Sequence, residues 1–257
     1  MSEPGTALIT GAAVRIGRAL ALDLATQGWR VGLHCHGSAA QAEELARQIR
    51  KDGGSAAVLP ADLTDGAAPA HLLRMCASAL GAPTLLVNNA AMFLGDEIAD
   101  LDPAQWDAQL AVNLRAPVFL AKAFAAELPA GASGNIINII DQRVWKPTPR
   151  YFSYTASKQA LWGATRTLAQ ALAPRVRVNA IGPGPVLRNA HQTEEEFQAQ
   201  CKATILGRGT TPQEIAAAIR FILDAPAMTG QMIALDGGQH LAWQTSDVDG
   251  SGTRRTS

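Results

Sequence analysis

Two side chains that could move a proton lie close together in the middle of the chain. Tyr154 and Lys158 are four residues apart, so a helix would place both on one face. A lysine ammonium beside a phenol favours the phenolate, which is expected to lower the pKa of Tyr154 and make it a usable general acid. The same spacing also occurs on surface helices without a catalytic role, so the surrounding residues must decide.

A short turn near the start of the chain could bind a phosphate. Residues 10–17 read TGAAVRIG and lie between an expected strand and an expected helix. Small residues let the backbone approach a pyrophosphate at a helix N-terminus, where amide groups and the helix dipole favour anions. This context predicts a dinucleotide site, although a glycine-containing turn by itself would be only a turn.

The end of the second expected strand bears on which dinucleotide would bind. An NAD enzyme usually places Asp or Glu there to hold the ribose 2′-hydroxyl. Residues 34–38 of this chain read HCHGS and include no acid. Donors such as His36 and Ser38 suit a 2′-phosphate, so we predict NADP(H), although the histidines could also merely end the strand.

The elements that must position these residues alternate along the chain. Most expected strands are continuous Val, Ile, Leu and Ala runs, as in a parallel sheet covered on both faces. The expected strands are 7–10, 31–35, 56–59, 85–88, 135–140, 176–181 and 232–235, and the expected helices are 16–27, 39–51, 66–79, 103–127, 152–172, 193–202 and 212–223. The alternation predicts one α/β domain over residues 1–244, a Rossmann-type doubly wound parallel sheet of about seven strands. Residues 245–257 are rich in Ser, Thr, Gly and Asp, and we expect a disordered tail.

The composition argues against several other classes of protein. The 257 residues carry no net formal charge, and no basic stripe indicates nucleic-acid binding. No apolar run reaches the about 18 residues that span a bilayer, and no signal peptide is visible. Cys35, Cys76 and Cys201 match neither a disulfide framework nor a zinc pattern. We therefore expect a cytoplasmic protein that binds a small molecule, without metal, membrane or nucleic acid.

Together, the motifs resemble those of the short-chain dehydrogenase/reductase family over roughly residues 5–243. The chain carries, in the family's order, the glycine turn, Asp62-Leu63, Asn88-Asn89-Ala90-Ala91, Asn113, Tyr154-x-x-x-Lys158, Pro183-Gly184 and Asp236-Gly237-Gly238. The resemblance implies hydride transfer with a nicotinamide cofactor, the protein supplying position and a proton. It also implies a homotetramer whose interface uses the helices expected at 103–127 and 152–172.

Two departures from the general family pattern resemble the branch of pteridine and dihydromonapterin reductases. Arg15 stands where the family's turn has a glycine, and Asp141 replaces the catalytic serine thirteen residues before Tyr154. The stretch around His36 is also similar to the LHxHRSAA pattern of pteridine reductases, but Gly37 replaces its arginine. Because that arginine would clamp a 2′-phosphate, the resemblance leaves strict NADP preference open.

The resemblance also implies roles for individual residues. Tyr154 would donate the proton, Lys158 would hold the nicotinamide ribose, and Asn113 would join a water chain that resupplies the proton. Asp62 would accept a hydrogen bond from the adenine amine. The implied cofactor residues are Gly11, Arg15, Ile16, Gly17, His36, Ser38, Asp62, Leu63, Asn89, Ala90, Ala91, Lys158, Pro183, Gly184 and Val186, and the implied substrate residues are Arg15, Phe93, Asp141 and Tyr154.

The exchange of serine for Asp141 bears on the substrate. A serine hydroxyl donates to a ketone oxygen, whereas an ionised carboxylate cannot donate and would repel a developing alkoxide. A carboxylate can accept from the N–H groups of a pterin, or share a proton with Tyr154 and pass it to a ring nitrogen. Asp141 therefore favours reduction of a pterin-like C=N bond, although it could also simply cap its loop.

Several other residues are expected around the substrate. Phe93 stands where pteridine reductases carry a phenylalanine that stacks on the pterin, and Arg15 could reach a pterin oxygen. Trp145 and Tyr151 could form a wall of the pocket, or these aromatic side chains could be ordinary packing. The polar segment 186–207 is expected to close over the ligand.

Three functions are compatible with these residues. The first is an NADPH-dependent pterin reductase, and the second is a reductase acting on a carbonyl such as a 3-oxoacyl thioester or a small ketone. The third is a non-catalytic NADP-binding regulator. Asp141 and Arg15 argue against the second, while the intact Tyr154, Lys158 and Asn113 argue against the third.

Overall fold

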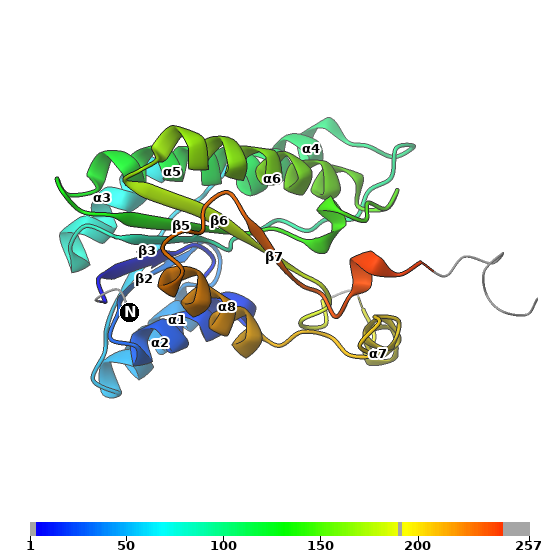
Figure 1. The fold of residues 1–257 in the computed structure, drawn as a ribbon, viewed down its shortest axis with the longest axis horizontal. Coiled ribbons are helices and arrows are strands. Elements are labelled where there is room, and N and C mark those ends of the chain that lie inside the picture. Colours follow the sequence, from blue (N-terminus) through cyan, green and yellow to red (C-terminus); the bar gives the residue numbers. More distant parts are fainter. Residues whose placement is uncertain (1–3, 190–191, 244–257) are drawn as a thin grey trace, which may run out of the picture.

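A seven-stranded sheet runs through the centre of the protein, with the strand order β3-β2-β1-β4-β5-β6-β7 (Figure 1). The computed structural model describes residues 4–189 and 192–243, so the predicted tail at 245–257 lies outside the described residues. Every pair of neighbouring strands is parallel. The strands are β1 (Thr6–Ile9), β2 (Arg30–Cys35), β3 (Ser55–Pro60), β4 (Leu85–Asn88), β5 (Gly134–Ile139), β6 (Val176–Pro183) and β7 (Met232–Leu235). The predicted Rossmann-type fold is confirmed.

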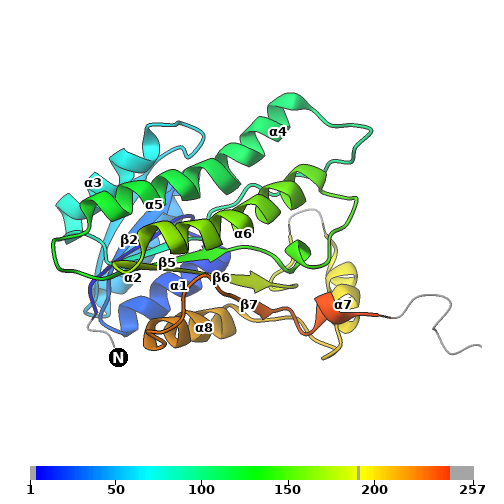
Figure 2. The same cartoon turned by 45° about the horizontal axis from the view of Figure 1, so that its top comes forward.

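Helices cover both faces of the sheet, and each layer buries its own hydrophobic core (Figures 1 and 2). One layer contains α1 (Arg15–Thr26), α2 (Ala39–Lys51) and α8 (Pro212–Asp224). The other contains α3 (Ala68–Leu80), α4 (Pro103–Leu110), α5 (Ala116–Glu127) and α6 (Phe152–Leu172). The helix α7 (Glu194–Lys202) lies beyond the end of the sheet in both views. Two short 3-10 turns, η2 (Gln142–Val144) and η3 (Gln239–Leu241), follow β5 and β7.

The predicted helix over residues 103–127 differs from the structure in one respect. One turn of π-helix, η1 (Ala111–Arg115), separates α4 from α5. A π-turn inserts an extra residue into the helical repeat and re-aims the side chains around it. Here it contains Asn113, whose side chain is fully buried. Periodicity alone cannot reveal this local change, because the apolar repeat continues on both sides.

The strand order creates a topological switch point between the carboxyl ends of β1 and β4. β1 lies between β2 and β4, so the connections that follow β1 and β4 leave the sheet toward opposite faces. Ligands of open α/β sheets bind at such a switch point. Among the described residues, no helix is both long and apolar enough to cross a membrane.

Candidate active site

The turn between β1 and α1 is joined to the loop after β4 at the switch point. Asn89 Nδ2 donates to the carbonyl oxygens of Thr10 and Gly11 at 2.9 and 3.0 Å. Thr10 Oγ1 accepts from the backbone N–H groups of Asn89 and Ala90, each at 3.0 Å. Gly11 has a φ of 62°, a backbone conformation that favours glycine. These contacts bring together predicted cofactor residues that are far apart in the sequence.

The start of α1 has the features of an anion site. Its N-cap residue, Val14, makes no side-chain capping bond, and its first turn carries no acidic residue. The amide groups of this turn therefore remain available to a pyrophosphate. A Cβ on Gly17 would clash with the Gly11 carbonyl, so glycine is required for the helix to pack against the turn. The donor set fits the dinucleotide that the sequence predicts.

Arg15 has a left-handed backbone conformation, which residues other than glycine rarely adopt. Its φ is 54°, in the left-handed region. Its guanidinium donates to the carbonyl oxygens of Leu187 and Arg188 at 3.0 and 2.7 Å, and so connects the phosphate turn to the segment after β6. Contact between Arg15 and a pterin oxygen stays a prediction.

His34 is a site residue that the sequence analysis missed. Its side chain is buried at the end of β2, where Nδ1 accepts from the Gly11 N–H at 3.0 Å and Nε2 lies 3.2 Å from the Ala61 carbonyl oxygen. Burial lowers the pKa of His34 to about 4, so the ring is neutral, with Nε2 carrying the proton. A histidine within the otherwise apolar strand VGLHC is the signal that could have identified it.

Residues predicted to face the adenosine of the cofactor lie together just after β2 and β3. His36 Nδ1 lies 3.4 Å from Asp62 Oδ1, and both side chains are exposed. Hydrogen bonds from Thr64 lower the pKa of Asp62, so its carboxylate stays ionised. A Cβ on Gly37 would meet nothing within 4 Å, and Ser38, the N-cap residue of α2, makes no side-chain cap. The chain at Gly37 is therefore uncrowded, and a 2′-phosphate at this corner stays a prediction.

The end of β6 is held tightly against the chain after β7. Gly184 N–H donates to the Leu235 carbonyl oxygen at 3.0 Å. A Cβ on Gly184 would lie 2.8 Å from the Asp236 Cα, so only glycine fits there. The remaining predicted cofactor residues lie at the same edge of the sheet: Ile16 in the first turn of α1, Leu63, Ala91 and Val186 after β3, β4 and β6, and Pro183 as the last residue of β6.

Tyr154 and Asp141 form a direct hydrogen-bonded pair. The tyrosine hydroxyl on α6 donates to Asp141 Oδ2 at 3.0 Å, and Asp141 lies just after β5. Asp141 Oδ1 accepts from the Arg143 N–H at 2.9 Å and so caps η2. The carboxylate therefore caps its loop with one oxygen and faces the tyrosine with the other. Lys158 Nζ lies 5.6 Å from the Tyr154 ring centroid and donates to the Ile139 carbonyl oxygen at 2.8 Å.

The predicted lowering of the tyrosine pKa is wrong for this structure. Burial raises the pKa of Tyr154 well above its usual value, and the Asp141 carboxylate raises it further. Burial also raises the pKa of Asp141, although Arg143, Tyr154 and Lys158 oppose the shift. Burial lowers the pKa of Lys158 to about 8. The phenol thus stays protonated at neutral pH and donates its hydrogen bond to the Asp141 carboxylate.

Asn113 holds the loop after β4 against α6. Its Oδ1 accepts from the Met92 N–H at 2.8 Å, and its Nδ2 donates to the Met92 carbonyl oxygen at 2.9 Å and to Ser157 Oγ at 3.1 Å. Both amide donors are therefore used, which gives the side chain a positioning role next to Phe93. A water chain through Asn113 stays a prediction.

Phe93 lies in an aromatic cluster beside Tyr154. Its ring stacks on Tyr151 with centroids 4.4 Å apart and meets Tyr154 nearly perpendicularly at 4.6 Å. Tyr151 therefore covers one face of the ring on which a pterin is expected to stack. Trp145 lies farther out and packs on His240 at 4.9 Å.

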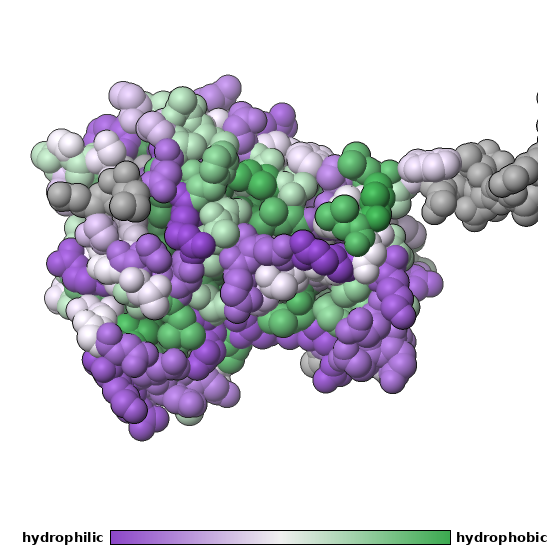
Figure 3. All heavy atoms as spheres, turned by 60° about the horizontal axis from the view of Figure 1, so that its bottom comes forward, coloured by the Kyte–Doolittle hydropathy of each residue, from purple (hydrophilic) through white to green (hydrophobic). Residues whose placement is uncertain are grey.

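The segment expected to close over the ligand contains α7. A capping box between Thr193 and Glu196 begins this helix. Leu206 N–H donates to the Gly237 carbonyl oxygen, so the end of the segment lies against the chain before η3. Ile205, Leu206 and Leu241 are exposed here, and Figure 3 shows a hydrophobic group at this end of the molecule.

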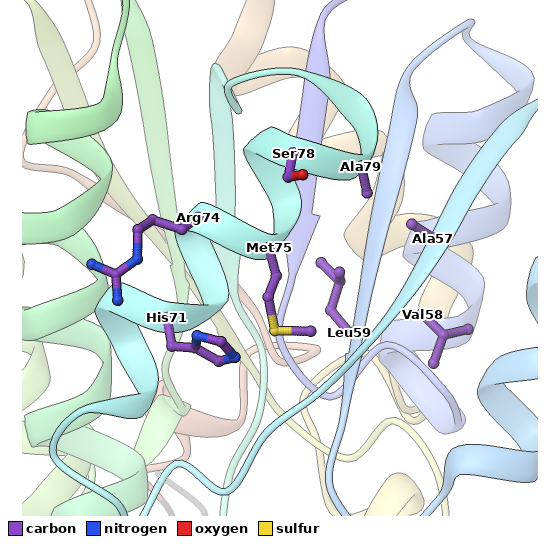
Figure 4. Close-up of a pocket in the computed structure, with 8 residues that line it drawn as sticks. All are labelled: Ala57, Val58, Leu59, His71, Arg74, Met75, Ser78 and Ala79. Carbon is purple, nitrogen blue, oxygen red and sulfur yellow. The ribbon is translucent and has the colours of Figure 1, made fainter.

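A separate shallow hollow of about 500 Å³ lies at the sheet edge between β3 and α3. Figure 4 shows His71, Arg74 and Met75 of α3 beside Val58 and Leu59 of β3. None of the predicted site residues lines this hollow. Among the described residues, no group of three or more His, Cys, Asp or Glu could hold a metal ion.

Comparison with known proteins gives matches over nearly the whole chain. A family model described as enoyl-(acyl carrier protein) reductase matches residues 11–240. A short-chain type dehydrogenase/reductase of Picea abies is 31% identical over 247 residues, covering 91% of this chain and 91% of the relative. Pteridine reductase 1 of Leishmania tarentolae is 32% identical over 277 residues, covering 91% of this chain and 96% of the relative.

A solved structure is more similar still. The crystal structure of FolM alternative dihydrofolate reductase 1 from Brucella canis, complexed with NADP, has a TM-score of 0.93 and 47% identity, covering 96% of this chain and 98% of that chain. From the order of its motifs, its sheet and these matches, the chain belongs to the short-chain dehydrogenase/reductase family.

Proposed function

We propose that the protein catalyses NADPH-dependent reduction of a C=N bond in a pterin-like ring, such as a dihydropterin or dihydrofolate. The observation that carries the proposal is the hydrogen bond between Tyr154 and Asp141 Oδ2. The similarity to a dihydrofolate reductase that was crystallised with NADP, and to a pteridine reductase, supports the same substrate class and cofactor. We further propose a cytoplasmic homotetramer.

The residues at the site can supply the proton that this reaction needs in addition to the hydride. NADPH, when bound, supplies the hydride. Tyr154 keeps its proton at neutral pH because burial and Asp141 raise its pKa, so it can protonate a basic ring nitrogen. Asp141 Oδ2 accepts the hydrogen bond of the tyrosine hydroxyl and so holds that proton in the site until a ring nitrogen takes it. Lys158 on α6 donates to the Ile139 carbonyl oxygen and lies 5.6 Å from the Tyr154 ring centroid, and it would also hold the nicotinamide ribose.

The Tyr154–Asp141 pair also disfavours the reduction of a ketone. A carbonyl oxygen becomes an alkoxide during hydride transfer, and a carboxylate beside it raises the energy of that charge. A ring nitrogen that accepts a proton develops no such negative charge. The carbonyl alternative, such as a 3-oxoacyl thioester, is supported by the matching family model, which names the acyl carrier protein, and by a 3-oxoacyl-[acyl-carrier-protein] reductase that is 32% identical to this chain.

The direct test compares substrates and two variants. NADPH oxidation would be followed by absorbance with dihydropterins, dihydrofolate, a 3-oxoacyl thioester and a small ketone. We expect Tyr154→Phe to lose roughly 100-fold or more on every substrate, because the proton donor is removed. Asp141→Ser should lose turnover on pterins only. Retained pterin reduction by Asp141→Ser, or a wild-type preference for the thioester, would contradict the proposal.

A further inference from the structure

One cation beside the catalytic pair has no place in the scheme above. Arg143 belongs to η2, two residues after Asp141. Its guanidinium carbon lies 4.9 Å from the ring centroid of Tyr151, 5.3 Å from that of Phe93 and 5.8 Å from that of Tyr154. The guanidinium thus lies in the aromatic cluster of the candidate active site.

This guanidinium has no acceptor among the described residues. The Arg143 backbone N–H donates to Asp141, but the side chain makes no hydrogen bond or ion pair with the described part of the chain. Its Nη1 atom is buried and without a partner. A guanidinium carries five N–H donors, and burying such donors unpaired is costly. The aromatic rings attract its charge but accept none of these bonds in the way an oxygen or nitrogen would.

Arg143 lies next to the two residues that are proposed to handle the proton, Asp141 and Tyr154. The Asp141 carboxylate accepts from the Arg143 backbone with one oxygen and from Tyr154 with the other. The Arg143 charge also acts to lower the pKa of both Asp141 and Tyr154, opposing the effect of burial. An acceptor bound by this guanidinium therefore lies in the same aromatic cluster as the ring of Tyr154.

The closed aromatic stack limits where a flat substrate can lie. A ring inserted between Phe93 and Tyr151 would need a separation of about 7 Å, twice a van der Waals contact of about 3.5 Å. The observed centroid separation is 4.4 Å. The substrate ring must then approach beside this stack, where Arg143 and Tyr154 lie, unless Tyr151 moves.

We propose that Arg143 is a substrate-binding residue that donates a hydrogen bond to an acceptor atom on the heterocyclic ring, such as its amide-like carbonyl oxygen. The inference rests on the proposed function and deepens it. A charged, forked donor suits a planar acceptor. The ring is the favoured partner because the guanidinium lies beside the catalytic tyrosine, whereas the carboxylates of a folate tail would remain near solvent.

The test replaces Arg143 and compares substrates with and without a tail. Arg143→Met removes the donors, Arg143→Lys keeps the charge, and Arg150→Met on the same loop is the control because Arg150 is exposed. Each purified variant would be assayed with a tail-free dihydropterin and with dihydrofolate. NADPH affinity would be measured by fluorescence, and folding by thermal melting.

We expect Arg143→Met to lower kcat/KM roughly 10- to 100-fold on both substrates, with unchanged NADPH affinity and melting temperature. Arg143→Lys should recover part of this loss, and Arg150→Met should match the wild type. A loss confined to dihydrofolate, an equal loss of NADPH affinity, or no loss in an enzyme that reduces dihydropterins would overturn the inference. If the wild type reduces no dihydropterin, the proposed function itself fails.

Discussion

Lys158 is predicted to hold the nicotinamide ribose, so its charge is expected to make cofactor affinity depend on pH. Burial lowers the pKa of this lysine to about 8, so the ammonium becomes a neutral amine as the pH rises through that value. A neutral amine binds the ribose hydroxyls of a nicotinamide cofactor less strongly than a cation does. The titration therefore weakens binding on the alkaline side.

We predict that the dissociation constant of NADPH rises severalfold between pH 7 and pH 9.5. This range lies above the titration of a phosphate monoester near pH 6, so the ligand's own charge is constant. Fluorescence titration at fixed ionic strength measures the constant. Lys158→Arg keeps its charge throughout this range and should bind with a flat pH profile. A flat profile for the wild type would contradict the role given to the Lys158 charge.

At the scale of elements, His34 joins three connections that form the cofactor crevice. It lies at the end of β2, accepts from the turn after β1 and contacts the carbonyl just before Asp62. Its two ring nitrogens perform different tasks, since one accepts and the other donates. Substitutions can therefore separate the two contacts.

We predict that His34→Leu weakens NADPH binding roughly 10-fold, because the Gly11 N–H and the Ala61 carbonyl both lose a buried partner. Asparagine places an oxygen near the position of Nδ1, so His34→Asn should retain the bond to Gly11 and bind more tightly than His34→Leu. Calorimetric titration with NADPH measures the difference, and kcat at saturating cofactor serves as the control. Equal affinities for the wild type and His34→Leu would show that His34 is only a packing residue.

At the scale of the whole molecule, α5 and α6 form an outer layer that is available to a second subunit. They run side by side in both ribbon views (Figures 1 and 2). Phe119 on α5 is 46% exposed, with Lys122 over its ring. A closed tetramer with dihedral symmetry uses at least two different interfaces, so the loss of one leaves dimers.

We predict that Phe119→Asp converts a tetramer to dimers, because the new carboxylate would be buried between subunits. Light scattering coupled to size-exclusion chromatography gives the mass. Arg47→Asp on the exposed face of α2 is the control for a surface charge change outside this layer. A tetramer that persists in Phe119→Asp, or a monomeric wild type, would contradict the proposed interface.

The sequence by itself determined the elements and much of the crevice. Strand and helix positions followed from local periodicity, and the predicted strands agree with the structure to within one or two residues at each end. The phosphate turn was found from its place between β1 and α1, and the Tyr154–Lys158 spacing from the repeat of one helix. These features are local, since each depends on residues only a few positions apart.

Only the tertiary structure decided which of the candidate residues are in contact and how deeply they are buried. The bond between Asp141 and Tyr154 joins the end of a strand to a helix, and the direction of the tyrosine pKa depends on how deeply that pair is buried. The contacts of His34 and the cluster around Arg143 likewise join segments separated by tens of residues. Burial and long-range proximity follow from packing, so no local pattern could supply them.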